Sequence, residues 1–322
     1  MIYKKHERLI AITGVLSSIL IYIWICYMKF IFYIKSIKMK FIVKYIEKNK
    51  NLHTLFLWLL LLKFLLKRGK SLKLLLIFLY NSFLYYICNI KKDVTISIAW
   101  NKVIMPNHMR PIDGFIEIMQ DDFYDRLVWY DTVLDIWGYI WESAIRLAKN
   151  NKKIVVYEAH PHNYKYLLLN TSNYNNIESY NMAVVWNHDT SITFYGGAFN
   201  MSATINRQLD TQEGLTIPSI NIVDVLRKYP YDAIKIDIEG AEYTCMQSII
   251  NSSQEVFENI QAWFIEFHDI SLNNHYQILQ DVLTWLEIKK YKIEYYNAID
   301  NYKIDYQTID QYTTILIYFM KK

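Results

Sequence analysis

Two carboxylates, Asp237 and Glu239, follow directly after a β-branched run that begins at Ile234. The run predicts a buried strand, and the glycine after it opens residues 241–250, whose pattern is typical of a helix. The strand would bring both carboxylates to its carboxyl end, the edge at which open α/β sheets bind ligands. Because burying two carboxylates is costly unless they bind something, they indicate a ligand site. Alternatively, Glu239 caps the helix and Asp237 is only solvated.

The sequence from Thr132 onward alternates short apolar runs with segments of helical spacing. Strands are predicted at residues 132–136, 153–158, 176–185, 191–195, 232–238, 262–267, 292–296 and 313–320, and helices at 140–149, 161–170, 223–229 and 276–290. This alternation predicts an α/β fold with a mostly parallel, doubly wound sheet and helices on both faces. No helix separates the last two strands, so we expect an antiparallel strand at one edge of the sheet.

The stretch from Lys235 to Glu242 carries the pattern Lys-x-Asp-x-Glu-Gly-x-Glu. This pattern resembles the signature of the FkbM family of S-adenosylmethionine-dependent methyltransferases. Other segments resemble the family in the same order: Arg110–Asp113, Glu158 with Pro161 and Asn163, Asn181–Val184, Ser219–Leu226 and Phe264–His268. The resemblance covers about residues 95–322. It implies a Rossmann-like methyltransferase fold with S-adenosyl-L-methionine as the cofactor.

The resemblance also implies which residues hold the cofactor. Glu158, at the end of the second predicted strand, would accept hydrogen bonds from the ribose hydroxyls; alternatively, it caps the following helix. Asn181 and Ala183 lie in the stretch that resembles the segment after the family's third strand, where the adenine usually rests. The remaining cofactor-binding candidates are Asp135 and Gly138, after the first strand, and Asp237.

Methyl transfer to a hydroxyl needs in-line positioning and often a general base. The candidates for this chemistry lie at the predicted carboxyl edge of adjacent strands and are Asp237, Glu239, Glu266 and His268. His268 is the most natural base near neutral pH; alternatively, it is bonded to a neighbouring carboxylate and has no catalytic role. No metal is expected, because the set formed by Glu266, His268 and Asp269 with His160 and His162 matches no established ligand spacing.

The loop after the first predicted strand departs from the family pattern Asp-x-Gly-Ala-Asn-x-Gly. Asp135 is kept and Gly138 stands at a shifted place, but Trp137 and Trp141 replace glycines that would let the methionine moiety approach the backbone. Either the tryptophans turn away, or they fill the cofactor pocket and leave an inactive binding or scaffolding module.

A nicotinamide-dependent oxidoreductase is disfavoured because no GxGxxG pattern follows the first strand.

The first 92 residues differ from the rest in charge and apolar content. They hold 17 Lys or Arg and only 2 acidic residues, whereas the remainder holds 18 basic and 29 acidic residues. Leu9–Met28 is uncharged and long enough to cross a bilayer, and residues 29–50 are typical of a basic amphipathic helix on an anionic lipid surface. We expect a membrane-anchor region at residues 1–92, with one to three membrane helices, and a methyltransferase domain at residues 93–322.

The expected function is that of a membrane-anchored O-methyltransferase acting on a hydroxyl of a sugar, glycolipid or other small metabolite. Basic residues crowd each loop after the first span, so the positive-inside rule predicts a cytoplasmic C-terminal domain if the later crossings number zero or two. The expected partners are membrane lipid and a small-molecule or lipid-linked glycan acceptor. Nucleic acid is excluded, because the basic charge belongs to the apolar N-terminal region and not to the folded domain.

Overall fold

The computed structural model describes residues 93–98, 101–106, 120–194, 214–253, 256–270, 274–297, 303–312 and 314–321. The predicted membrane-anchor region, residues 1–92, lies outside the described residues, as does the Arg110–Asp113 segment. Within the ranges that are described, no helix combines the length and the apolar character needed to cross a bilayer.

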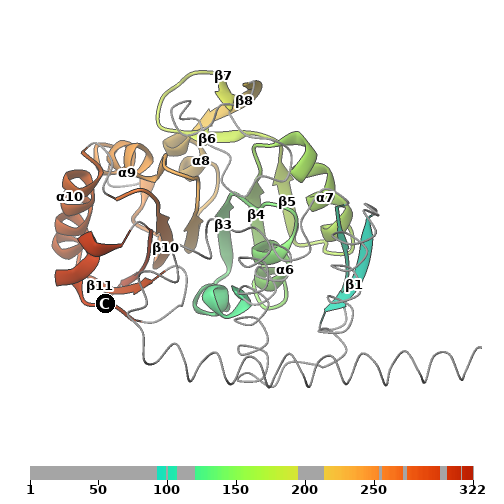
Figure 1. Ribbon diagram of the computed structural model, residues 1–322, viewed down its shortest axis with the longest axis horizontal. Helices are drawn as coiled ribbons and strands as arrows, with labels where there is room; N and C mark the ends of the chain where they lie inside the picture. Colours follow the sequence, from blue (N-terminus) through green and yellow to red (C-terminus); the bar gives the residue numbers. More distant parts are fainter. Residues whose placement is uncertain are drawn as a thin grey trace, which may run out of the picture. The chain divides into compact units, whose positions relative to one another are not determined.

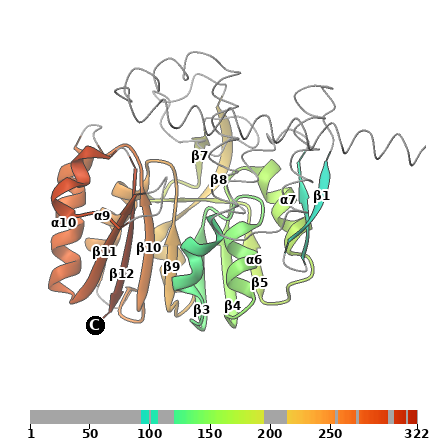
Figure 2. The same ribbon diagram turned by 60° about the horizontal axis from the view of Figure 1, so that its bottom comes forward.

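Seven strands form the central sheet, in the order β11-β12-β10-β9-β3-β4-β5 (Figures 1 and 2). Their bounds are β3 Thr132–Ile136, β4 Lys153–Tyr157, β5 Ile177–Tyr180, β9 Ala233–Ile236, β10 Ala262–Phe267, β11 Tyr291–Asn297 and β12 Ile315–Lys321. The five strands from β10 to β5 are parallel to one another. The predicted parallel, doubly wound sheet is therefore confirmed.

The last two strands pair antiparallel at one edge of the sheet, as expected, but the strand that runs antiparallel to the others is the inner of the two and not the edge strand. β12 pairs antiparallel with both β10 and β11, so β11 is the edge strand. The physical reason is the composition of the two strands. Residues 315–319 of β12 are apolar and buried on both faces, whereas β11 carries Lys292 and Glu294 and is only half-buried. A strand that is apolar on both faces is more stable between two neighbours, and charged residues protect an exposed edge.

The strand order reverses between β3 and β9. From β3 the chain proceeds to β4 and β5 on one side, and later to β9 and β10 on the other. Such a topological switch point creates a ligand-binding crevice beyond the carboxyl ends of the two strands. In the β3–β9 register, Asp135 is paired with Lys235, one position before each strand ends. Residues that follow these two strands therefore meet at the switch point.

Helices cover both faces of the sheet. Their bounds are α6 Glu142–Ala148, α7 Pro161–Thr171, α8 Ile222–Lys228, α9 Glu242–Ile250 and α10 His275–Ile288, with 3-10 helices η2 Gln120–Leu127 and η4 Tyr306–Gln311. Figure 2 shows α6 over β3 and β4, where Leu147 joins a buried cluster with Val156 and Phe264. Alternate strand residues point to opposite faces, and on the other face Phe267 packs against Tyr243 of α9, with ring centroids 5.2 Å apart.

Two smaller sheets flank the central one. The hairpin consists of β1 Val94–Ile98 and β2 Asn101–Met105, and the three-stranded sheet consists of β6 Ala183–Val185, β8 Leu215–Asn221 and β7 Ser191–Phe194. The single strand predicted at residues 176–185 is wrong: the chain leaves the central sheet after Tyr180 and enters the small sheet at Ala183. Asn181 stabilises this break, because its Nδ2 donates to the carbonyl oxygens of Glu158 and Ala159 at 2.9 and 3.0 Å.

Candidate active site

Lys235 of β9 is buried at the centre of the switch point. Its Nζ lies 3.2 Å from Asp135 Oδ1 and 3.6 Å from Asp237 Oδ2, and it donates a hydrogen bond of 2.9 Å to the carbonyl oxygen of Trp137. Burial alone would lower the pKa of Lys235, but the negative charge of Asp135 and its other neighbours outweighs burial and raises it. Lys235 therefore links the loop after β3 to the end of β9 as a cation.

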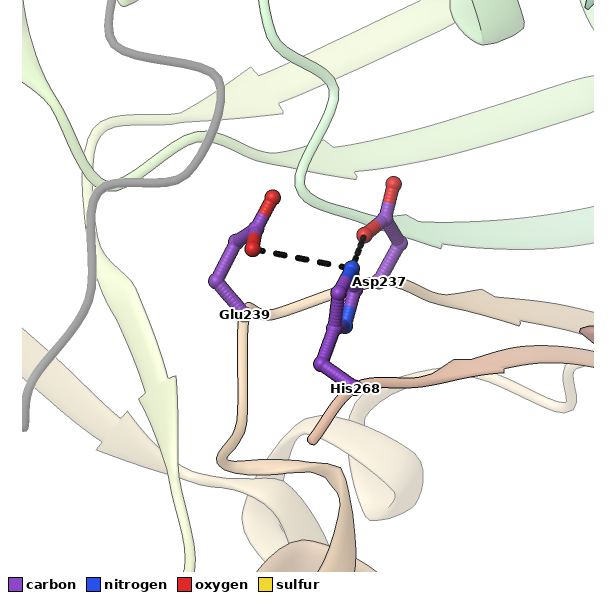
Figure 3. Close-up of side chains that lie close together, drawn as sticks. All are labelled: Asp237, Glu239 and His268. Carbon is purple, nitrogen blue, oxygen red and sulfur yellow. Dashed lines mark ion pairs between the residues drawn. The ribbon is translucent and has the colours of Figure 1, made fainter. Parts of the chain in front are cut away.

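Four predicted catalytic residues come together at the ends of β9 and β10. His268 Nε2 lies 3.5 Å from Glu239 Oε2, 3.6 Å from Glu266 Oε1 and 3.9 Å from Asp237 Oδ1. Figure 3 shows the side chains of Asp237 and Glu239 turned toward the His268 ring. We call Asp237, Glu239, Glu266 and His268 the carboxylate–histidine cluster. The predicted shared edge has thus brought together residues from two segments about thirty positions apart in the sequence.

Glu242, to which the sequence assigned no role, holds this cluster in place. It is buried at the start of α9, and its Oε1 lies 3.0 Å from His268 Nδ1. The same carboxylate accepts hydrogen bonds from the backbone N–H groups of Ile238 and Gly240, at 2.9 Å each. These N–H groups belong to the turn before α9, and no side chain caps the helix itself, so Glu239 is not its cap. The signal was present, because Glu242 is the last position of the sequence motif.

The turn between β9 and α9 directs Glu239 into the cluster. Glu239 has a φ of 53°, and the following Gly240 has a φ of 102°. Left-handed conformations are easy for glycine and cost other residues about 1–3 kcal/mol. A glutamate in this conformation, with its side chain directed at the imidazole of His268, indicates a functional site and not a turn that only joins β9 to α9.

The charges of the cluster shift the pKa of each group that shares it. Burial would lower the pKa of His268, but the carboxylates of Glu242 and Glu239 outweigh burial and raise it well above its ordinary value. Burial and the charge of Asp237 raise the pKa of Glu266 to about 8, and burial is the main cause of the raised pKa of Glu239. Because a protonated imidazole cannot accept a proton, these shifts disfavour His268 as the base near neutral pH.

The loop after β3 keeps the turn of a glycine loop although its side chains are large. Trp137 and Tyr139 have φ values of 80° and 48°, and the N–H groups of Trp137 and Gly138 both donate to the carbonyl oxygen of Tyr157. A Cβ atom on Gly138 would lie 2.1 Å from Val156 Cγ1, so only glycine fits there. The side chains of Trp137, Tyr139 and Trp141 are buried. The tryptophans therefore do not turn away into solvent.

Glu158, the predicted ribose ligand, is buried and holds two loops together. Its Oε2 accepts from the N–H of Tyr139 at 2.9 Å, and its Oε1 accepts from the N–H of His160 at 2.8 Å. The helix cap that follows is His160, whose Nδ1 accepts from the N–H of His162, so Glu158 is not the cap of α7. His160 and His162 thus serve the start of α7 and are not part of the carboxylate–histidine cluster.

The burial of Glu158 predicts a pH-dependent stability. Burial raises its pKa from 4.5 to about 8. The folded protein therefore holds this proton more tightly than the unfolded chain does. The resulting stabilisation is complete below about pH 4.5 and is lost as the pH rises to about 8, by up to about 1.4 kcal/mol per pH unit. Glu158→Gln cannot titrate and is expected to remove this slope. Urea unfolding of both full-length proteins across this range checks it, and equal slopes would contradict it.

The predicted ribose and adenine ligands lie at the same edge of the sheet. Glu158 directly follows β4, Asn181 directly follows β5 and is bonded to the Glu158 and Ala159 carbonyls, and Ala183 begins β6. The loop after β3 adds a buried indole Nε1, that of Trp141, which has no hydrogen-bond partner among the described residues. The ribose and adenine candidates therefore lie together at one edge, but Glu158 is buried with both carboxylate oxygens bonded within the protein, and the aromatic side chains of the loop occupy the space that glycines leave open in the family pattern.

Comparison with known proteins identifies a family model and several solved structures that are similar to this chain. The sequence matches the methyltransferase FkbM domain over residues 124–293. No curated protein matches the chain in sequence. Among solved structures, an rRNA methylase from Streptococcus thermophilus is 11% identical, with 63% of this chain and 94% of that chain covered and a TM-score of 0.37. TYW2 from M. jannaschii in complex with AdoMet is 12% identical, with 72% and 88% covered and a TM-score of 0.39.

The exclusion of nucleic acid as a partner needs correction. The similar structures include the rRNA methylase and the 23S rRNA methyltransferase ErmE, which is 12% identical, with 63% of this chain and 66% of that chain covered and a TM-score of 0.34. Proteins named for RNA methylation therefore occur among the structures similar to this one, and the exclusion drawn from the charge distribution was wrong. At this identity the likeness concerns the fold alone, so it assigns no RNA substrate to this chain.

The family match covers more than half of the chain and contains the switch point, the loop after β3, Glu158 and the carboxylate–histidine cluster. It confirms the resemblance that the sequence motifs carry and, with it, S-adenosylmethionine as the cofactor. The chain therefore belongs to the FkbM family of methyltransferases.

Proposed function

We propose that this protein is an S-adenosylmethionine-dependent O-methyltransferase whose acceptor is a hydroxyl of a sugar, glycolipid or other small metabolite. One observation carries the proposal: Lys235 contacts both the cofactor loop, through the carbonyl oxygen of Trp137, and the carboxylate–histidine cluster, through Asp237. The groups able to receive a proton therefore adjoin the loop that would hold the methyl donor. That adjacency is what methyl transfer to a hydroxyl requires.

The cluster offers a definite place for the acceptor. When bound, the cofactor supplies an electrophilic methyl group on a sulfonium centre. Glu266 is the most exposed of the four cluster residues, with 25% of its side chain accessible, against 14–19% for the other three. Because its pKa is raised to about 8, Glu266 is ionised in mildly alkaline solution, where its carboxylate would accept a hydrogen bond from the acceptor hydroxyl and then receive the hydroxyl proton. Asp237 and Glu239 would orient the acceptor, and Glu242 would fix the His268 ring.

The reaction can be tested without knowing the acceptor. Full-length protein is incubated with S-adenosylmethionine labelled in its methyl group and, separately, with a small-molecule extract, a lipid extract and total RNA from the expression host. We expect label in the small-molecule or lipid extract, in a bond that survives mild alkali as an ether does and an ester does not. Label found only in RNA would contradict the proposed acceptor. If the protein binds the cofactor saturably but transfers no labelled methyl group to any of the three extracts, the result would instead support a scaffolding module.

We also infer that residues 1–92 anchor the protein in a membrane, with the methyltransferase domain on the cytoplasmic side. Two features of residues 1–92 support this inference: the uncharged run Leu9–Met28, and a content of 17 basic but only 2 acidic residues. The protein is expected to stay in the membrane pellet through an alkaline carbonate wash. Protease added outside intact cells should leave the C-terminal domain uncut until detergent is added. Release by carbonate would contradict the anchor, and cleavage in intact cells would contradict the orientation.

A further inference from the structure

We propose that Asp237, Glu239 and His268 form a binding site for one divalent transition-metal cation, of the Mn²⁺ to Zn²⁺ class. The site has one imidazole nitrogen and two carboxylate oxygens, and all three donor atoms lie within 4.8 Å of one another. Figure 3 shows the three side chains converging from the turn after β9 and the end of β10. The inference goes beyond the proposed methyl transfer, because cation binding requires neither cofactor nor acceptor.

The separations between the donor atoms suit ligands around an ion better than a direct salt bridge. His268 Nε2 lies 3.5 Å from Glu239 Oε2 and 3.9 Å from Asp237 Oδ1. Charge-assisted hydrogen bonds are shorter, at about 2.7–2.9 Å. Two ligands that are each about 2.1 Å from a tetrahedral cation stand about 3.4 Å apart. The donor atoms therefore surround a central space of the size that a small divalent cation needs.

Groups behind the ligands orient two of them. Glu242 contacts Nδ1 of His268 at 3.0 Å and so leaves Nε2 to face the site. Lys235 Nζ lies 3.6 Å from Oδ2 of Asp237, while Oδ1 of the same carboxylate faces His268. A carboxylate on the remote nitrogen of a metal-binding histidine is the usual support of such ligands. Both supports are buried, so the ligands are held in place before a cation arrives.

The negative charge around His268 also favours the binding of a cation. Four carboxylates, those of Asp237, Glu239, Glu242 and Glu266, surround His268. A metal ion would replace the proton that His268 carries, and Lys235 would remain as a nearby cation. Like charges at such distances are stabilised either by protons or by a metal ion. The nitrogen ligand favours Mn²⁺ or Zn²⁺ over Ca²⁺ and Mg²⁺, which prefer oxygen alone. With three protein ligands, at least one coordination position stays open, as in catalytic sites.

The sequence did not predict this site, because it considered a different set of residues. The set of Glu266, His268 and Asp269 with His160 and His162 is not assembled, since His160 and His162 lie at the start of α7. The proposed ligands instead come from two loops, and Glu239 reaches the site only through its left-handed backbone conformation. No local spacing pattern can reveal ligands that two separate strand ends bring together.

Direct binding of Mn²⁺ tests the proposal. Full-length protein is treated with a chelator, dialysed, and titrated with Mn²⁺ while free Mn²⁺ is followed by electron paramagnetic resonance, with Zn²⁺ competition as a second readout. We expect one saturable site per chain that Zn²⁺ displaces. Asp237→Asn and His268→Gln are expected to weaken Mn²⁺ binding at least about 10- to 100-fold, and Glu242→Gln, which changes only a supporting group, by about 10-fold or more. Glu287→Gln, an exposed carboxylate of α10, should leave the affinity unchanged.

Two outcomes would overturn the proposal. The first is no saturable binding by folded wild-type protein, which would leave the cluster neutralised by protons alone. The second is equal weakening, or none, in the Asp237, His268 and Glu287 variants, which would show binding at scattered surface carboxylates. Circular dichroism confirms that each variant is folded. Because the titration contains no S-adenosylmethionine, its result is independent of whether the methyl-transfer assay succeeds.

Discussion

Replacing Lys235 with methionine is expected to lower the free energy of unfolding by about 3–5 kcal/mol. Methionine has a similar length and fills the same apolar space, so the loss comes from charge and not from a cavity. The carboxylate of Asp135 is buried and would lose its cation at 3.2 Å, while the carbonyl oxygen of Trp137 would lose its donor. A buried charge without a partner is among the most destabilising single changes in a protein. Urea unfolding of the full-length protein measures the loss.

A surface ion pair of the same types provides the control. Lys152 and Asp131 lie 2.7 Å apart with 77% and 63% of their side chains exposed, so Lys152→Met is expected to change the free energy of unfolding far less than Lys235→Met does. The double variant Lys235→Met with Asp135→Asn removes both buried charges. It should therefore cost less than the sum of the two single variants. A Lys235→Met protein no less stable than the Lys152→Met protein would show that this buried lysine does not support the switch point.

The convergence of the carboxylate–histidine cluster could be predicted because its residues stand at the ends of two neighbouring strands. Asp237 and Glu239 stand directly after an apolar strand, and His268 follows the next strand of the sheet. The carboxyl ends of parallel strands meet at one edge, so their convergence follows from strand order. The distances within the cluster bear out that reasoning. The helices α7 and α10 were also predicted well, since their apolar spacing extends over several turns.

The remaining features depend on contacts that sequence spacing does not contain. A lysine inside a strand gives no sign that its partner is Asp135, which lies 100 positions earlier and meets it only through the β3–β9 pairing. Strand β8 was missed because Pro218 interrupts its alternation, and the structure places that proline opposite Ser191 in an antiparallel pair. Glu158 directly follows its strand, one residue beyond the observed strand end, and its bond to the N–H of Tyr139 depends on the turn that Gly138 permits.

Replacing Glu266 with glutamine is expected to lower the rate of methyl transfer by about 10²- to 10⁴-fold, the usual contribution of a general base. Glutamine keeps the size and one hydrogen-bonding oxygen, so the acceptor hydroxyl can still be held, but the amide cannot receive its proton. Cofactor affinity should change little, because Glu266 lies at the end of β10, whereas the cofactor candidates other than Asp237 lie at the ends of β3, β4 and β5 or at the start of β6. Labelled-methyl transfer gives the rate, and calorimetry gives the affinity for S-adenosylmethionine.

The variant also separates proton transfer from cation binding. Glu266 lies 3.6 Å from His268 Nε2 but is not one of the three donors that lie within 4.8 Å of one another. A base acting directly on the hydroxyl predicts that Glu266→Gln loses rate while it keeps Mn²⁺ affinity within a few-fold of wild type. If the rate and the affinity fall together, Glu266 acts by supporting the cation and is not the base. If Glu266→Gln keeps both its transfer rate and its Mn²⁺ affinity, and so behaves like the control variant Glu287→Gln, the hydroxyl proton leaves by another route. The role given to Glu266 would then be wrong.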